Sequence, residues 1–141
     1  TAWLPAVEPD STQDISASYL QTIPLLLHMP PKNIFDDRLT KLQLYVDIPE
    51  NSIESVSIFY RTNTMENMQE ITLAKEKGPY SFNFDPGIQG GDSVTYFFTV
   101  AVKDQSIHAT PLDINGKIEP YNKPLVDPIK YYEERLKSLK W

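Results

Sequence analysis

The sequence predicts an all-β protein: an antiparallel β-sandwich of about seven short strands, with an irregular N-terminal arm and a C-terminal amphipathic helix. Three observations lead to this prediction. Apolar and polar residues alternate along several short segments, as they do in half-buried strands. Turn-forming residues, among them many of the 12 prolines, separate these segments at intervals of about 8–12 residues. Only residues 127–141 change to a helical period.

Alternation between turns predicts the first five strands. The first is expected within residues 19–29, where Pro24 suits an edge position because its missing N–H is not needed there. In the next four strands the apolar residues of one face recur at every second position. These residues are Leu42, Leu44, Val46 and Ile48 in the second strand, Val56, Ile58 and Tyr60 in the third, Ile71 and Leu73 in the fourth, and Tyr80, Phe82 and Phe84 in the fifth.

The longest regular pattern lies in GDSVTYFFTVAVKDQSIHATP, residues 91–111. It predicts a long, half-buried sixth strand, a turn over residues 103–106 and a seventh strand in SIHATPLDI. Tyr96 is either a plain core residue or a corner tyrosine that ties a loop to the sixth strand. The buried face of the sixth strand is expected to contain Val94, Tyr96, Phe98, Val100 and Val102.

The pattern divides the chain into four segments. We expect an N-terminal arm or linker over residues 1–19, the sandwich over residues 20–115, an extended connector over residues 116–126 and the amphipathic helix over residues 127–141.

Asp127 suits the N-cap of the terminal helix, and Pro128 suits its first turn. A helix of about fifteen residues is marginal in water by itself, so its apolar face needs a partner. That partner is this sandwich, another copy of the chain or a neighbouring domain. The apolar face consists of Ile129, Tyr132, Leu136 and Leu139.

Composition limits the classes of partner. A net charge of -6 argues against nucleic acid, because phosphate binding depends on clustered Lys and Arg. The absence of cysteine excludes disulfides and thiolate metal sites. The longest apolar run, residues 23–27, is too short to span a bilayer. The chain begins at Thr1 rather than methionine, so either an N-terminal segment such as a signal peptide was removed or the sequence is a fragment. Of the possible locations, we expect an exported, periplasmic or cell-surface protein.

Three stretches carry a resemblance to a known class of domain: LQLYVDIPENSIESVSIFYRTN, ITLAKEKGPYSFNFDPG and GDSVTYFFTVAVKDQSIHATP. Together they resemble the immunoglobulin-like and fibronectin type III-like β-sandwich modules of bacterial exported or surface proteins, over about residues 23–112. The chain differs from antibody-type domains because it has no cysteine pair, and it lacks the core tryptophan typical of the early strands of fibronectin type III modules. The resemblance implies an immunoglobulin-like sandwich and says little about function.

No catalytic or metal-binding constellation stands out. His28 and His108 lie in different predicted strands, and Asp104, Ser106 and His108 share one strand face at best, which is poor geometry for a triad. We therefore expect no enzyme and no cofactor. Acidic residues in loops are candidates for calcium ligands, although such residues more often form turns. They occur in FDDR at residues 35–38 and as Asp85, Asp92 and Asp104.

Two binding functions remain. We expect a non-catalytic protein-interaction or spacer module of an exported or envelope-associated protein, with the helix face as its partner-binding surface. The alternative is a carbohydrate-binding module attached to a secreted enzyme, because flat aromatic side chains stack on sugar rings. The candidate stacking residues are Tyr45, Phe97, Trp3 and Trp141.

Overall fold

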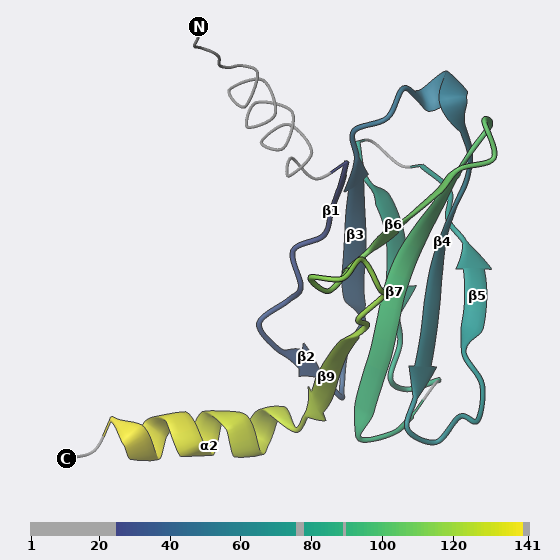
Figure 1. The fold of residues 1–141 in the computed structure, drawn as a ribbon. Helices are drawn as coiled ribbons and strands as arrows, with labels where there is room; N and C mark the ends of the chain where they lie inside the picture. Colours follow the sequence, from purple (N-terminus) through teal and green to yellow (C-terminus); the bar gives the residue numbers. More distant parts are fainter. Residues whose placement is uncertain (1–24, 76–77, 89, 140–141) are drawn as a thin grey trace, which may run out of the picture.

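The computed structural model describes residues 25–75, 78–88 and 90–139, and Figure 1 shows their arrangement. This part of the chain is mostly β structure in two sheets, followed by one C-terminal helix. The predicted arm over residues 1–19 lies outside the described residues, as do Trp3 and Trp141.

The smaller sheet has three antiparallel strands in the order β1-β3-β6. In the register of this sheet, Leu27 lies opposite Tyr45, and Leu44 lies opposite Tyr80. The strands are β1 (Leu26–Leu27), β3 (Thr40–Val46) and β6 (Tyr80–Phe84).

The larger sheet has the order β2-β9-β7-β4-β5, and β8 also pairs with β7. The long antiparallel pair of β4 and β7 forms its centre. The strands are β2 (Ile34–Phe35), β4 (Ile53–Thr62), β5 (Gln69–Thr72), β7 (Ser93–Val102), β8 (Ile107–Thr110) and β9 (Tyr121–Val126). A short 3-10 helix, Glu50–Ser52, precedes β4, and the α-helix α2, Pro128–Ser138, follows β9.

Side chains from the two sheets fill one common core. The predicted alternation along β7 is confirmed, because every second side chain from Val94 to Val102 is buried. The largest fully buried side chains are Tyr60, Tyr96, Phe84, Phe98, Ile34, Leu42, Leu44 and Ile58. Burying apolar side chains of both sheets against each other is the main stabilising contribution to such a sandwich.

Several boundaries differ from the prediction. In the described part of the predicted first strand, only Leu26–Leu27 pair as β1. Residues 121–126 of the expected connector form β9, which pairs antiparallel with β7 and parallel with β2. Residues 25–75, 78–88 and 90–139 therefore contain nine strands, and the expectation of a wholly antiparallel sandwich is wrong at the pair β2 and β9. Two-residue strands such as β2 carry too little alternation to be found from sequence.

Between β8 and β9 the chain leaves the edge of the larger sheet and forms a small hairpin over residues 111–119. Leu112 lies opposite Ile118, and the Asp113 carboxylate accepts hydrogen bonds from the backbone N–H groups of Asn115 and Lys117 at 2.8 and 2.9 Å. Gly116 adopts φ +79°, which a glycine tolerates at the end of such a turn. The predicted seventh strand thus ends at Thr110, before this hairpin.

Gly91 lies where the chain enters β7, and its lack of a side chain is needed there. A Cβ at this position would lie 2.5 Å from Asn63 Oδ1, the oxygen that accepts a hydrogen bond from the Asp92 backbone N–H at 2.7 Å. We expect Gly91→Ala to lower the free energy of unfolding by about 1–2 kcal/mol, because the loop over residues 62–64 must shift. Urea denaturation measures this change. Gly90→Ala is the matched control, since its Cβ would meet only Pro86 O at 3.7 Å. Equal effects of the two substitutions would refute this explanation.

Candidate functional site

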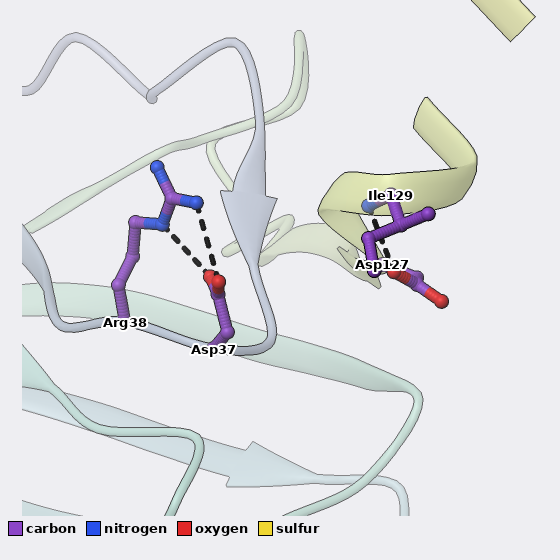
Figure 2. A network of polar contacts seen from close by, with 4 residues as sticks. All are labelled: Asp37, Arg38, Asp127 and Ile129. Atoms are coloured by element: carbon purple, nitrogen blue, oxygen red, sulfur yellow. Dashed lines mark hydrogen bonds and ion pairs between the residues drawn. The ribbon is translucent and has the colours of Figure 1, made fainter. Parts of the chain in front are cut away.

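The helix α2 begins directly at the end of β9. Its N-cap is Asp127, whose carboxylate accepts a hydrogen bond from the Ile129 backbone N–H at 2.9 Å (Figure 2), and Pro128 occupies the first turn. Both roles were predicted from the sequence and are confirmed. Because no loop separates Val126 of β9 from the capped first turn, the direction of the helix is set by the sheet.

An aromatic cluster holds the first turn of α2 against β2. The Phe35 ring contacts Tyr131 edge to face, with centroids 5.6 Å apart, and stacks with Tyr132 at 6.1 Å. The Arg38 guanidinium lies 4.6 Å from the Phe35 ring centroid and also donates to Asp37 at 2.8 Å, a contact visible in Figure 2. The Asp36 backbone N–H donates to Val126 O at 2.9 Å. We call Phe35, Arg38, Tyr131 and Tyr132 the root of α2.

Beyond this root, α2 extends away from the sandwich (Figure 1), and none of its residues is buried. The four apolar residues predicted as a binding face lie at positions i, i+3, i+7 and i+10, so they form one strip along the helix. Their exposed fractions are 69% for Ile129, 54% for Tyr132, 61% for Leu136 and 62% for Leu139. We call these four residues the helix strip. Tyr132 of this strip contacts Phe35 of β2, and among the described residues none of the four strip residues packs against the hydrophobic core.

The cap at Asp127 should stabilise α2 without stabilising the sandwich. We expect Asp127→Ala to weaken the helix by about 1 kcal/mol, because the Ile129 N–H loses its acceptor. Amide hydrogen exchange should then become several-fold faster in α2, while the midpoint of urea unfolding stays unchanged, because α2 contributes no buried side chain. Asp127→Asn keeps an acceptor and should behave like the natural chain. A large loss of global stability in Asp127→Ala would show that α2 supports the core.

His28 is buried between the two sheets. Its Nδ1 lies 2.7 Å from the Gln43 carbonyl oxygen, and its Nε2 lies 2.8 Å from the Tyr96 hydroxyl. Because a carbonyl oxygen only accepts, Nδ1 carries the proton, and the neutral ring accepts at Nε2 from the Tyr96 O–H. The ring also contacts Phe98 and Tyr121. Burial lowers the pKa of His28, and the hydrogen bond to Gln43 partly offsets this effect.

Tyr96 is therefore a core residue, and the corner interpretation is wrong. Its hydroxyl bonds to the side chain of His28, which follows β1, rather than to the backbone just upstream of Tyr96. Burial raises the pKa of Tyr96 far above its usual range, so the hydroxyl stays protonated. His28 was expected in the first strand, but it lies just after β1. Its contact with Tyr96 could not be predicted from the sequence, because the two residues are 68 positions apart.

The other polar candidates have structural partners. The Ser106 hydroxyl donates to Asp104 at 2.5 Å, so Ser106 and Asp104 form a turn before His108 rather than a nucleophile and its base. Hydrogen bonds from Ser106 lower the pKa of Asp104. Asp85 accepts from the Gly87 backbone N–H at 2.9 Å, as acidic turn residues commonly do. Within the described residues, no three metal-ligating side chains gather at one place.

The predicted carbohydrate-stacking residues that the structure describes lie on opposite sheets. Phe97 is half-buried on the outer face of the larger sheet and stacks on Phe59 of β4, with centroids 4.9 Å apart and ring planes 6° from parallel. At that separation the rings cover each other's faces, which leaves each one face for a ligand. This is the geometry of a cross-strand aromatic pair. Tyr45 lies on the outer face of the smaller sheet. Sugar binding stays a prediction.

Sequence reasoning missed a second exposed apolar surface, on β1 and its neighbours. Leu26 and His28 point into the core, while the residues between and beside them point outward. Tyr45 joins this outward row, because it lies directly opposite Leu27. We call the four residues the β1 face. Their exposed fractions are 42% for Leu25, 47% for Leu27, 74% for Met29 and 49% for Tyr45. The alternation in LLLHM indicates that Leu25, Leu27 and Met29 share one face, but the sequence does not show that this face points outward.

Comparison of the chain with protein-family models and with curated proteins finds no match. Among the described residues, no helix is both long and apolar enough to cross a bilayer. The helix strip and the β1 face are two candidate binding surfaces of the described residues, and a further exposed apolar group, Leu112, Ile114 and Ile118, lies on the hairpin over residues 111–119.

Proposed function

We propose that this protein is a non-catalytic protein-interaction module, and that the helix strip on α2 is its docking surface. The observation that carries the proposal is the exposure of all four strip residues on a helix with no buried side chain. Helices of this length are marginal in water and usually obtain their stability from a packed apolar face. A helix that projects into solvent with a continuous apolar strip fits a groove or surface on another polypeptide.

The root supports this proposal because it orients the strip. The root contacts hold the first turn, and Asp127 caps the helix directly after β9. A binding element that is oriented before it meets its partner loses less conformational freedom on association. The sandwich then serves as a rigid spacer that presents α2 to its partner.

We further propose that the sandwich is of the immunoglobulin-like type and belongs to an exported or envelope-associated protein. The strand order supports the first part: β1, β3 and β6 on one sheet and β5, β4, β7 and β8 on the other match strands A, B, E and C′, C, F, G of that architecture. The resemblance to modules of exported and surface proteins supports the second part. A fold of this kind does not specify a function by itself, so the proposed function is based on the helix strip.

Position-specific photocrosslinking in the producing cells tests the proposed function. A photoreactive amino acid replaces Leu136 of the strip in one variant and Glu134, on the opposite side of α2, in the control. We expect irradiation to join a second polypeptide to the chain at position 136 and at least tenfold less at position 134. Equal or absent crosslinking at the two positions would contradict the proposal. The mass of the crosslinked product shows whether the second polypeptide is another copy.

A further inference from the structure

We propose that the partner of the helix strip is a second copy of this chain, with each α2 seated on the β1 face of the other copy. This inference rests on the proposed function of α2 and adds the identity of the partner. In this arrangement the helix strip of each copy contacts the β1 face of the other copy, so that two of the exposed apolar surfaces cover each other. Two such reciprocal contacts form a closed, two-fold symmetric dimer, which is the commonest form of homo-oligomer.

The two surfaces match in length and chemistry. From Ile129 to the C-cap residue Leu139 the strip spans ten residue steps, which is about 15 Å at the rise of a helix. From Leu25 to Met29 the β1 face spans four residue steps, which is about 13 Å at the rise of a strand. Both surfaces combine aliphatic side chains with one tyrosine, Tyr132 on the helix and Tyr45 on the sheet. A helix laid along this outward row therefore covers all of it.

The helix cannot reach the β1 face of its own chain. Asp127 caps α2 immediately after Val126, which is paired with Phe35 of β2, and the root then packs Tyr131 against Phe35. Folding α2 back would break these contacts. In Figure 1 the helix extends away from the sandwich, and both surfaces remain exposed within one chain. A second copy is the polypeptide that offers both complementary surfaces at equal concentration.

The apolar surface area buried at the interface distinguishes helix-on-helix pairing from the reciprocal seating of each strip on a β1 face. Each partly exposed side chain of this size offers on the order of 100 Å² of apolar surface. Two helices packed on each other would remove about 800 Å² in total, below the roughly 1,200–2,000 Å² of specific interfaces. Two reciprocal seatings of a strip on a β1 face remove about 1,600 Å², which lies inside that range. The reciprocal arrangement is therefore the one that the exposed surface can stabilise.

Charge favours the same arrangement. Between Pro128 and Ser138, α2 carries the basic side chains Lys130, Arg135 and Lys137 and the acidic side chains Glu133 and Glu134, a net charge of +1. The whole chain carries -6, so the remainder carries -7. Asp47, whose N–H donates to Leu25 O at 2.7 Å, lies at the end of the β1 face. A basic helix is attracted to this acidic body, and two such helices are not attracted to each other.

Single-cysteine crosslinking tests the inference, and the chain suits it because it contains no cysteine. Full-length Leu27→Cys and Leu136→Cys are mixed in equal amounts and oxidised under mild conditions. We expect the disulfide between positions 27 and 136 to form at least tenfold faster than the disulfide between two copies of the same variant. Both positions are exposed, so the variants should fold, and circular dichroism checks this. If Leu27→Cys fails to fold, Met29→Cys takes its place.

Two matched controls sharpen the result. Glu134→Cys lies on the other side of α2 and is mixed with Leu27→Cys. Glu70→Cys lies on the far edge strand β5 and is mixed with Leu136→Cys. Both control disulfides should form at least tenfold more slowly than the disulfide between positions 27 and 136. A dominant disulfide between two copies of position 136 would overturn the inference in favour of helix pairing, and rates equal to the controls would overturn any pairing of copies. Photocrosslinking of position 136 to a different polypeptide would then leave the proposed function standing while this inference fails.

Discussion

Replacing Phe98 with alanine is expected to lower the free energy of unfolding by about 3–5 kcal/mol. Phe98 lies in the middle of β7, is fully buried and contacts the rings of His28 and Tyr96 at centroid distances of 4.8 and 5.9 Å. The substitution removes a large apolar side chain from a place where the two sheets meet, and it leaves a cavity that the paired strands cannot close. Urea denaturation followed by tyrosine fluorescence measures the change.

Thr99→Ala is the control for this prediction. Thr99 is the next residue of the same strand, and its side chain points to the outer face of the larger sheet. We expect its effect to stay within about 0.5 kcal/mol, as is usual for substitutions away from the core. If Phe98→Ala cost no more than Thr99→Ala, the two sheets would not share the core that the structure shows.

The second large effect is a loss of stability in acid that depends on His28. The folded protein lowers the pKa of His28 below its ordinary value of 6.5 because the ring is buried. Below pH 6.5 the unfolded chain therefore binds a proton that the folded chain does not bind. The stability contributed by neutral His28 is complete above pH 6.5 and decreases as the pH falls toward the folded pKa, by up to about 1.4 kcal/mol per pH unit.

Two histidine variants isolate this effect. His28→Gln removes the titrating group but keeps an acceptor for the Tyr96 hydroxyl, so the slope of stability against pH between 6.5 and 5 should flatten. His108→Gln changes a half-buried histidine of β8 and is the matched control. Urea unfolding at pH 7.5, 6.5, 5.5 and 5 provides the measurement. An unchanged slope in His28→Gln would mean that other groups cause the acid sensitivity.

Much of the fold could be predicted because the burial pattern of a single strand is visible in its own sequence. Strands β3, β4, β6 and β7 each have one face in the core and one face outside, and this produces the alternation from which they were expected. The start of α2 was predictable for a similar local reason, because Asp127 and Pro128 satisfy the requirements of a helix N-terminus without any tertiary contact.

The features that were missed depend on contacts between distant segments. The strands β2 and β9 pair in parallel although Ile34 and Leu125 are far apart in the sequence, and neither strand has a long alternating pattern. The bond between His28 and Tyr96 joins segments 68 residues apart. The β1 face became apparent only when the structure placed Leu27 opposite Tyr45. Local periodicity carries no information about such pairings.

Sedimentation equilibrium on the natural chain and on Leu136→Glu tests most directly whether the helix strip is an association surface. We predict that the natural chain populates a dimer as its concentration rises and that Leu136→Glu raises the dissociation constant at least tenfold, because it places a charge in the strip. Glu134→Gln, on the opposite side of α2, should associate like the natural chain. Equal masses for the natural chain and Leu136→Glu at every concentration would contradict pairing through the strip.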